Sequence, residues 1–409
     1  MKLLLKLAWR NIWRNKRRSI LTLCAIIFAT FASVAMRGMQ IGTYELNISN
    51  AVNMFSGYIQ IQKNGYRQNP SINKNFKYNN EIEEKINSVP GILGYAPRVY
   101  ADGLISFKDN SLGAAVFGVD PQKEKSTTKF LDRVKEGKFF ESHDTYEIVL
   151  GTKLMENLKA KIGDEIVILS QGYDGSLGNL KFKIIGTVKM GMQEFDASTA
   201  FIGLETAQEL VAMYGRIHAI AIKADDITNV ENIQNVLTQK LNDGNLAVLS
   251  WEEVMSDFKQ SIELDNVSGI FMLLILITIV AFGILNTVLM SVTERFNEFG
   301  VTLSIGMPQM KLVSLVFIET FFLTLIGIVI GDIIGWFINY ILILNPVEFG
   351  GELGKIYEEY GFLPRMESTN TISIFINTTL TILLVSMLSS IYPAYKTYKL
   401  EPLKGIRYT

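Results

Sequence analysis

The sequence has very few of the residues that usually carry metal or nucleophilic chemistry. Among 409 residues there is one cysteine, Cys24, and there are two histidines, His143 and His218. A single thiol excludes an intrachain disulfide framework and any multi-thiolate zinc or iron–sulfur site. The HExxH, GxSxG and GxxxxGK[ST] patterns are also missing from the sequence. We therefore predict no catalytic residue, no metal site and no cofactor in this chain, and we expect that it does not itself hydrolyse ATP.

A large net charge of either sign is also missing. The 39 basic and 40 acidic residues leave a formal net charge of -1, which gives no overall attraction to nucleic acid. By contrast, 48% of the residues are apolar, only 19% are charged, and the mean hydropathy is +0.23. This composition is too apolar for an average soluble protein and favours a membrane protein.

Four apolar segments are long enough to cross a hydrocarbon core of about 30 Å at a helical rise of about 1.5 Å per residue. They cover residues 19–36, 266–293, 312–344 and 368–395. Three of them are free of charge, whereas the third contains Glu319 and Asp332. A carboxylate at the depth of Glu319 should face protein, pair or be protonated, and helix packing suits it better than substrate contact.

The orientation of the spans follows from the basic residues in their short flanks. Residues 2–18 contain seven Lys and Arg, and the stretch after the last span adds Lys396, Lys399, Lys404 and Arg407. Both termini are therefore expected in the cytoplasm. With four crossings, the segment between spans 2 and 3 is also inside, and the stretches near residues 40–262 and 345–369 are outside.

The basic leader has a helical pattern of its own. Lys6, Arg10 and Arg14 fall at i, i+4 spacing, and Trp9 and Trp13 suit a membrane interface. We interpret residues 2–17 as an amphipathic helix on the cytoplasmic leaflet. The alternative is a cleaved signal peptide that is processed after residues 33–35.

About 220 residues between spans 1 and 2 have a soluble composition and alternate short apolar runs with amphipathic stretches, which predicts a folded α+β domain. Two pieces of it each read as strand, helix, strand, one starting at GYIQIQ (57–62) and the other at HAIAIKA (218–224). Between them, residues 126–216 are expected to form a β-rich insertion. Its glycine-rich stretch QGYDGSLGN (171–179) predicts a hairpin tip, either a plain turn or a projection that binds a partner.

Several cytoplasmic and membrane stretches together resemble a known family. NTVLMSVTERFNEFG (286–300) is similar to the signature of FtsX-like, MacB-type ABC transporter permeases, with Phe299 where isoleucine is usual. FIET (317–320), followed by Gly327 and Gly331, resembles the FLxE motif of that family and its trailing glycines. The leader AWRNIWRNKRRS (8–19) and the ending YPAYK (392–396), with LEPL (400–403), fit the family's two termini.

The resemblance implies a coupling helix that sits in a groove of a separate ATPase dimer, which binds the ATP and Mg²⁺. The ATPase-coupling residues on this helix would be Glu294, Arg295, Glu298 and Gly300, where charges of both signs at the membrane surface suit directional, charge-assisted bonds. The alternative is a solvated loop with local charge pairing. The exported domain would consist of two subdomains, called porter and sabre, and a second permease chain, identical or related, would complete the complex.

Within this family the chain most resembles the lipoprotein-releasing (Lol-type) permeases of the bacterial inner membrane. This resemblance implies a type VII, mechanotransmission transporter that extracts lipoproteins from the outer leaflet. The alternatives are MacB-like efflux and FtsX-like signalling to a cell-wall hydrolase. A periplasmic carrier protein would bind the hairpin residues Gly172, Tyr173, Asp174 and Gly175. The apolar residues near the outer ends of spans 1 and 2 are Met36, Met39, Ile270 and Phe271. They would either contact acyl chains or serve ordinary helix packing.

The predicted fold is thus an α-helical membrane protein with four transmembrane helices and a large α+β periplasmic domain of porter and sabre subdomains between spans 1 and 2. In chain order we expect an amphipathic helix (1–18), span 1 (19–42), the exported domain (43–262, with porter 43–125 and 217–262 and sabre 126–216), span 2 (263–293), the coupling helix (294–310), span 3 (311–344), an outer loop (345–369), span 4 (370–395) and a cytoplasmic tail (396–409).

Overall fold

The computed structural model describes residues 2–14, 16–191, 193–359 and 362–401. The chain divides into two compact units. The helical unit consists of residues 1–45, 262–347 and 365–409, and the sheet unit of residues 46–261 and 348–364. Residues 402–409 of the predicted tail lie outside the described residues.

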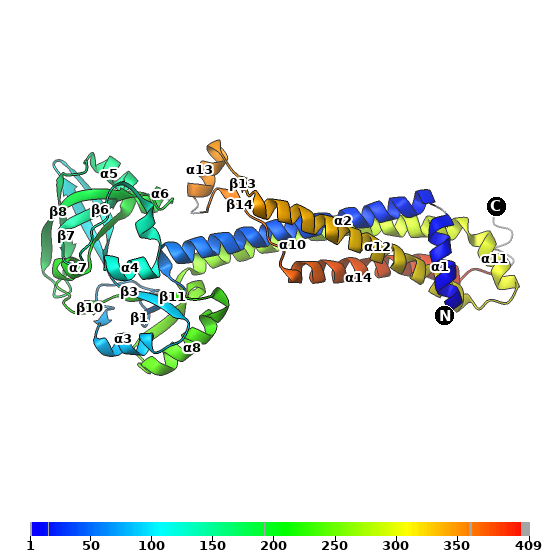
Figure 1. Ribbon diagram of the computed structural model, residues 1–409, viewed down its shortest axis with the longest axis horizontal. Coiled ribbons are helices and arrows are strands. Elements are labelled where there is room, and N and C mark those ends of the chain that lie inside the picture. Colours follow the sequence, from blue (N-terminus) through cyan, green and yellow to red (C-terminus); the bar gives the residue numbers. More distant parts are fainter. Residues whose placement is uncertain (1, 15, 192, 360–361, 402–409) are drawn as a thin grey trace. The chain divides into compact units, whose positions relative to one another are not determined.

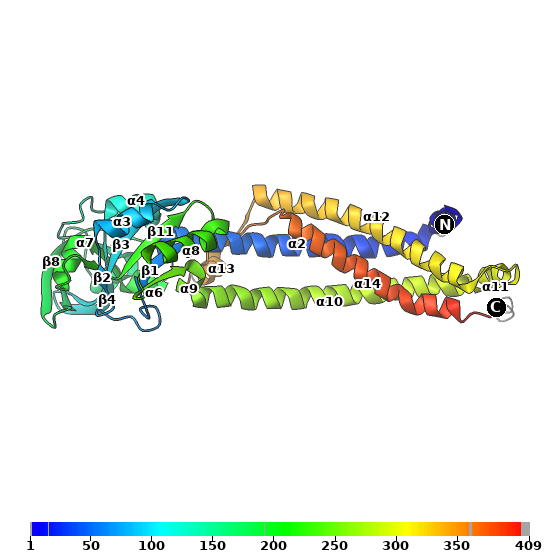
Figure 2. The same cartoon turned by 90° about the horizontal axis from the view of Figure 1, so that it is seen from below.

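The helical unit is built from long helices that lie side by side (Figures 1 and 2). The helices of this part of the chain are α1 (Lys2–Arg14), α2 (Lys16–Ala51), α10 (Ser256–Glu294), α11 (Phe296–Ser304), α12 (Gln309–Leu344) and α14 (Ile372–Tyr398). Among the described residues, four helices are long and apolar enough to cross a membrane. Three of them contain the predicted segments, and the fourth, α14, begins at Ile372, four residues after the start of the segment predicted over 368–395. The four spans are therefore confirmed.

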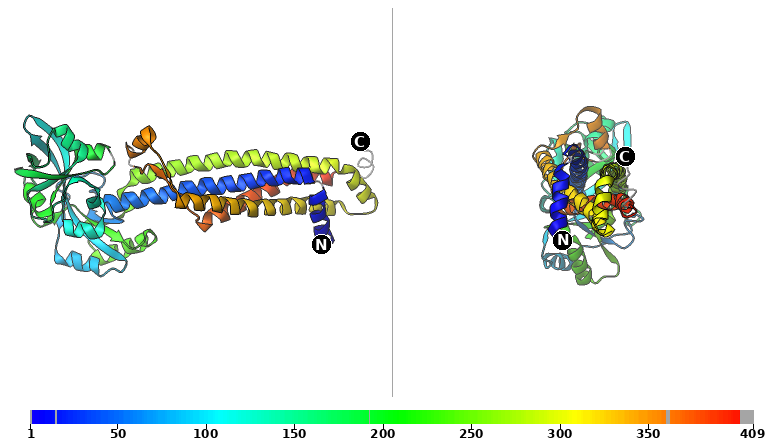
Figure 3. Two further views of the ribbon diagram at one scale, coloured as in Figure 1. Left: turned by 45° about the horizontal axis from the view of Figure 1, so that its top comes forward. Right: turned by 90° about the vertical axis from the view of Figure 1, so that its right-hand side faces the viewer.

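Helix α1 is shorter than the helix predicted over residues 2–17. It ends at Arg14, and Lys16 and Arg17 already belong to α2. Its Ala8 and Ile12 are buried, and α1 packs along α12. Figure 3 shows α1, the dark blue helix at the N-terminus, lying across the bundle near its end. The break gives the leader a direction different from that of the first span.

Glycines set the packing of α2 against α12. Gly327, Gly331 and Gly335 recur every four residues on α12, where a Cβ atom would collide with Ile26, Thr30 and Val34 of α2 in turn. Further along α2 the roles are exchanged, because Gly38 lies against Asn339 of α12. Gly42 lies against Ser368, in the segment that precedes α14. Small residues that let two helices approach closely are a common packing device in membranes.

The apolar core of the helical unit joins all four long helices and α11. Its buried residues include Ile26 of α2, Ile284 of α10, Phe299 of α11, Ile328 of α12 and Ile382 of α14. Because α11 contributes Phe296 and Phe299 to this core, the short helix is held to the bundle by apolar burial as well as by charge.

The sheet unit contains a sheet of ten described strands in the order β12-β1-β11-β3-β4-β9-β6-β8-β5, with β7 pairing with β3 and β8. The strands of the sheet are β1 (Ile59–Lys63), β3 (Ile92–Phe107), β4 (Asn110–Val119), β5 (Val134–Gly137), β6 (Glu147–Gly151), β7 (Glu165–Gln171), β8 (Leu177–Val188), β9 (Thr199–Gly203), β11 (Ala219–Ala224) and β12 (Leu246–Ser250). Four short strands form separate pairs, β2 (Phe76–Lys77) with β10 (Arg216–Ile217) and β13 (Val347–Glu348) with β14 (Arg365–Met366).

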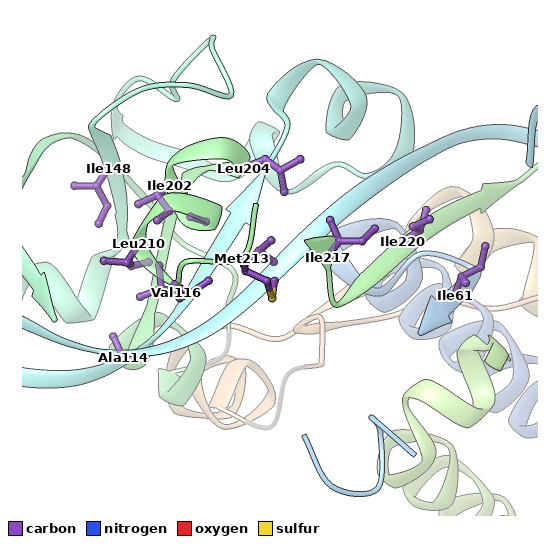
Figure 4. Close-up of a cluster of buried hydrophobic side chains, with 14 of the residues drawn as sticks. Ile61, Ala114, Val116, Ile148, Ile202, Leu204, Leu210, Met213, Ile217 and Ile220 are labelled. Atoms are coloured by element: carbon purple, nitrogen blue, oxygen red, sulfur yellow. The ribbon is translucent and has the colours of Figure 1, made fainter. Parts of the chain in front are cut away.

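The short helices complete this part of the chain. They are η1 (Val52–Ser56, a π-helical turn), α3 (Asn80–Asn87), α4 (Pro121–Thr127), η2 (Phe130–Arg133), α5 (Thr152–Leu158), α6 (Gln193–Ser198), α7 (Leu204–Leu210), η3 (Ile227–Asn229), α8 (Val230–Leu241), α9 (Trp251–Val254) and α13 (Gly351–Glu359). The main core lies between these helices and the sheet. Figure 4 shows part of it, where Val116 of β4, Ile202 of β9 and Leu210 of α7 gather.

The two predicted strand–helix–strand pieces are confirmed, as β1-α3-β3 and β11-α8-β12. They interlock, because β1 lies between β12 and β11, and β11 lies between β1 and β3. This is the arrangement of a split βαβ unit. The expected porter and sabre portions share one sheet, since β3 also pairs with β7 and β4 pairs with β9. The boundary between the two subdomains stays a prediction.

The predicted outer loop is not an isolated loop. Its residues 348–364 belong to the sheet unit. The backbone N–H of Leu363 donates to Asn47 Oδ1 at 3.0 Å, and the rings of Phe258 and Phe362 lie 5.6 Å apart. The connection between α12 and α14 therefore contributes packing to the sheet unit.

Candidate functional site

Arg295 lies at the junction of α10 and α11 and contacts two carboxylates. Its Nη1 donates to both oxygens of Glu319 on α12, at 3.0 and 2.9 Å, and its Nε lies 3.5 Å from Glu298 Oε2. The guanidinium also lies 4.9 Å from the centre of the Phe299 ring. A planar guanidinium can address two acids at once, which a lysine ammonium does less well. Arg295 thus joins α11 to α12.

Helix α1 reaches the same two carboxylates. Asn11 Nδ2 donates to Glu319 Oε1 at 2.6 Å, and Arg14 Nη2 donates to both oxygens of Glu298 at 2.7 and 2.6 Å. Residues three apart on a helix share a face, so one face of α1 supplies both donors. A further ion pair joins Arg18 of α2 to Glu294 at the end of α10. We call these seven residues the charge network.

Burial divides the charge network into a strong part and a weak part. The side chains of Arg295 and Glu319 are 13% and 14% exposed, whereas those of Arg14 and Glu298 are both 51% exposed. Breaking a buried pair by removing one partner costs about 3–5 kcal/mol, whereas an exposed pair contributes about 0.2–1 kcal/mol. The Arg295–Glu319 contact is therefore strong, whereas the direct Arg14–Glu298 contact is weak on its own.

The pKa of Glu298 reflects both influences. Partial burial alone would raise the pKa of this carboxyl, but the guanidiniums of Arg14 and Arg295 outweigh it and hold the pKa below the usual range. Glu298 is thus ionised at neutral pH and keeps its contact with Arg14.

The charge network surrounds a polar pocket of about 240 Å³. Besides the network residues, Thr22, Thr287, Ser291 and Thr320 line it. Hydroxyl groups from α2, α10 and α12 thus accompany the charged side chains. Such a lining suits water and rearrangement of hydrogen bonds better than an apolar ligand.

Three of the four predicted coupling residues form ion pairs within this chain. Glu294, Arg295 and Glu298 all pair with other helices of the same unit, and Gly300 is buried within α11. The sequence analysis considered contact with an ATPase and local charge pairing in a solvated loop. Neither alternative includes these contacts between helices. The exposed residues of α11 and of the turn after it include two apolar ones, Val301 and Ile305, and Ile305 is 83% exposed. Contact of these residues with an ATPase stays a prediction.

The predicted membrane-interface residues of α1 separate into two groups. Lys6, Trp9, Arg10 and Trp13 are exposed, and Arg14 belongs to the charge network. The rings of Trp9 and Trp13 meet edge to face at 6.0 Å, and Trp9 also contacts Phe322 of α12 at 5.9 Å. The exposed group leaves an amphipathic surface on α1, as an interfacial helix requires.

The predicted hairpin is confirmed as the connection between β7 and β8. Gly175 has φ +85°, a backbone conformation that favours glycine, and Asp174 Oδ1 accepts from the backbone N–H and hydroxyl of Ser176 at 3.0 and 2.6 Å. The N–H of Gly172 donates to the Ser176 carbonyl at 2.8 Å. Tyr173 is tied back, because its N–H donates to the Val211 carbonyl at 2.7 Å and Arg216 lies 5.5 Å from its ring. Carrier binding by this tip stays a prediction.

The predicted acyl-chain contacts are not all at one place. Ile270 and Phe271 are exposed on α10, while Met36 and Met39 on α2 are half-buried. Ile270 lines a pocket of about 150 Å³ between α2, α10 and α14, together with Ile41, Leu273, Ile277 and Ile374. The polar residues that line it are Ser33 and Arg37 of α2 and Ser373, Asn377, Thr378 and Thr381 of α14. The other three predicted residues do not line this pocket.

Sequence reasoning missed Asn11 entirely and did not identify the partners of Arg14 and Glu319. The available signals were an intramembrane carboxylate that needed a partner and a basic leader with an embedded asparagine. These signals do not specify which cation pairs with which acid, because Asn11 and Glu319 are 308 positions apart.

Comparison with known proteins agrees with the motifs. The FtsX-like permease C-terminal family matches residues 270–402, and the MacB-like periplasmic core domain matches residues 19–240. The lipoprotein-releasing system transmembrane protein LolC of Neisseria meningitidis is 23% identical over 330 residues, which are 78% of this chain and 79% of LolC. The macrolide export ATP-binding/permease protein MacB of Bdellovibrio bacteriovorus is 23% identical over 98% of this chain and 61% of MacB.

Among solved structures, the periplasmic region of MacB from Actinobacillus actinomycetemcomitans is 15% identical, with a TM-score of 0.37, and covers 53% of this chain and 97% of that one. The two family matches together extend from the first span to the end of the last, and the periplasmic core domain alone accounts for more than half of the chain. The resemblance predicted from the motifs is confirmed, and this chain belongs to the FtsX/MacB-type family of ABC transporter permeases.

Proposed function

We propose that this permease couples ATP hydrolysis by a separate cytosolic ATPase dimer to the release of lipoproteins from the outer leaflet of the bacterial cytoplasmic membrane. The supporting observation is the extent of the similarity to LolC, a lipoprotein-releasing protein, which covers nearly four fifths of both chains. The match to MacB covers almost all of this chain but only 61% of that ATP-binding/permease protein.

In the proposed orientation both termini and α11 face the cytoplasm. The basic flanks of the first and last spans support it, because positively charged flanks remain on the cytoplasmic side. Ile305, in the turn after α11, and the exposed residues of α11 then face the ATPase. The charge network holds α11 to the other helices of the unit. A second copy or a related permease chain completes the complex.

The acyl chains of the lipoprotein would enter at the outer ends of α2 and α10. The pocket lined by Ile270 offers apolar side chains from these helices and from α14, which suit a hydrocarbon chain, beside polar side chains of α14. Arg37 also lines this pocket, and Gln40 and Asn266 hold its side chain by accepting from its Nη1 at 2.6 and 2.9 Å. Its positive charge would lie beside a polar or anionic headgroup. A periplasmic carrier would then take the cargo.

The first test is to purify the complex from its native membrane and identify its components by intact mass spectrometry. We expect the permease dimer, an ATPase and an acylated lipoprotein. An ATPase accompanied by an adaptor protein and no acylated cargo would favour MacB-like efflux. Copurification of a cell-wall hydrolase instead would favour signalling. Either result would overturn the release proposal.

A second test uses the pocket directly. Ile270→Trp should fill the space that an acyl chain needs and reduce lipoprotein crosslinking, whereas Ile279→Trp, at an exposed position of the same helix that does not line the pocket, is the matched control. Equal crosslinking in both variants would contradict the proposed entry point.

A further inference from the structure

The charge network joins three helices through one side chain. Glu319 binds Asn11 and Glu298 binds Arg14, so α1 is attached to two acids, and Arg295 contacts both of those acids. Arg295 therefore sets the positions of the two groups that hold α1. The three helices meet through this residue although α1 is far from α11 and α12 in the chain.

We propose that α1 is a second coupling element, tied to α11 by Arg295 so that the two helices move as one body. The inference rests on the proposed function in one respect, namely that an ATPase displaces α11. Arg295 is a positioning residue in this scheme, because it acts through Glu298 and Glu319 and touches neither ATP nor cargo.

The strengths of the individual contacts explain why Arg295 is decisive. The Arg14–Glu298 pair is half exposed, so it is weak when its acid is free to rotate. The Asn11 contact depends on the orientation of the Glu319 carboxylate, which Arg295 fixes through two hydrogen bonds. Without Arg295, α1 keeps its apolar contact with α12 through Ala8 and Ile12 but loses its registration with α11.

The consequence for coupling comes from the surface of α1. Trp9 and Trp13 are exposed beside Lys6 and Arg10, which suits a helix lying at the membrane interface. A displacement of α11 would then be passed to an interfacial helix as well as to the spans. Joint movement of α1 with α11 is the property that distinguishes this scheme from passive attachment of the leader.

The test measures the distance between α1 and α11 by spin labels in the full chain, in lipid nanodiscs, with and without the ATPase trapped by ATP and vanadate. Cys24 is the single cysteine, so Cys24→Ala gives a background for labels at Arg10→Cys and Asn297→Cys, two exposed positions outside the charge network. We expect one narrow distance distribution that is the same in both nucleotide states.

Arg295→Lys keeps the charge, but an ammonium holds two acids less well than a planar guanidinium does, so the variant should broaden this distribution in both states. Release of cargo per ATP hydrolysed should fall by about tenfold, the factor that corresponds to one lost charge-assisted hydrogen bond. Lys6→Glu changes a charge on α1 outside the network and is the matched control, with an unchanged distribution.

Arg295→Gln combined with Glu319→Gln guards against a folding defect, because it leaves no unpaired buried charge. This double variant should fold and still show the broad distribution. A narrow distribution in Arg295→Lys, or a distance in the unmodified pair that changes between nucleotide states, would overturn the inference. Failure of lipoprotein release alone, with the distance results as expected, would instead refute the proposed cargo.

Discussion

Each unit of the molecule contains an arginine–glutamate pair that joins different elements, and the two units surround it differently. In the sheet unit, Arg98 of β3 donates to Glu124 of α4 at 2.7 and 3.0 Å, and both side chains are 0% exposed. Thr128 donates to the same carboxylate at 2.6 Å, and the Arg98 guanidinium lies 4.0 Å from the Phe55 ring. In the helical unit, Arg14 and Glu298 remain half exposed.

This difference in burial determines which ion pairs can open when the protein moves. Every polar atom of a buried pair must be satisfied, so such a pair holds one geometry and is costly to open. Burial alone would lower the pKa of Arg98, but Glu124 outweighs it and raises that pKa. An exposed pair exchanges with water at little cost. The sheet unit is thus fixed at Arg98, while the Arg14–Glu298 contact taken alone can open at little cost.

The largest effect on stability is expected from removing Glu124. Glu124→Ala leaves a buried guanidinium without its acid and should lower the free energy of unfolding of the sheet unit by about 3–5 kcal/mol. Glu81→Ala, which removes an exposed i, i+4 pair with Lys85, should cost less than about 0.5 kcal/mol and is the control. Pulse proteolysis of the full chain over a urea series measures both. A loss below about 1 kcal/mol for Glu124→Ala would contradict the rigid assignment.

Acid should affect the sheet unit before it affects the charge network. Burial lowers the pKa of His218 to about 4, and its Nδ1 accepts from the Tyr100 N–H at 3.0 Å. The unfolded chain binds this proton near pH 6.5, whereas the folded chain binds it only near pH 4. The free energy of unfolding is therefore unaffected above about pH 6.5 and falls by about 3 kcal/mol as the pH decreases toward 4. The depressed pKa of Glu298 keeps its contact until the pH falls below the usual glutamate range.

The measurement is urea unfolding of the sheet unit at several pH values between neutrality and pH 4. His218→Gln retains an acceptor but does not titrate, so its unfolding free energy should depend less on pH in this range. An equal dependence in the variant and the unmodified chain would show that other groups control acid unfolding.

The close contact between α2 and α12 can be tested by overpacking one of its glycines. A Cβ atom at Gly331 would lie 2.5 Å from Thr30 Cβ, so Gly331→Leu should destabilise the α2–α12 contact by about 1–3 kcal/mol. Gly283→Leu on α10, where nothing lies within 4 Å, is the control. The midpoint temperature for loss of monodisperse chain in detergent compares the two. Equal midpoints would show that α2 and α12 separate easily.

The smallest effect is expected at the exposed pair. Arg14→Ala should cost only about 0.2–1 kcal/mol, and raising the ionic strength toward 1 M, where the Debye length is about 3 Å, should mimic it. Hydrogen exchange of the α1 amides should therefore become faster with salt, while amides of β3 and α4 near Arg98 should not change. Salt-independent exchange in α1 would mean that the charges do not hold it.

The sequence was sufficient where local pattern decides structure. The four spans follow from uninterrupted apolar runs, the hairpin from the glycines and Asp174 of residues 171–179, and the two strand–helix–strand pieces from their alternation. The site was harder to predict. Glu294, Arg295 and Glu298 were identified as a group, but their partners Arg18, Glu319 and Arg14 lie far away in the chain. Long-range pairing depends on the packing of the helices, which hydropathy does not specify.

The alternating glycines of α2 and α12 also define how these helices can be displaced. An axial slip of α2 by one turn, about 5.4 Å, would place Val34 against Asn339 in one direction and Gly38 against Gly335 in the other. The first arrangement produces a collision and the second leaves a void, so only one register is well packed. The two helices therefore have a single axial setting, and any stroke that α2 makes along its own axis must be shared by α12.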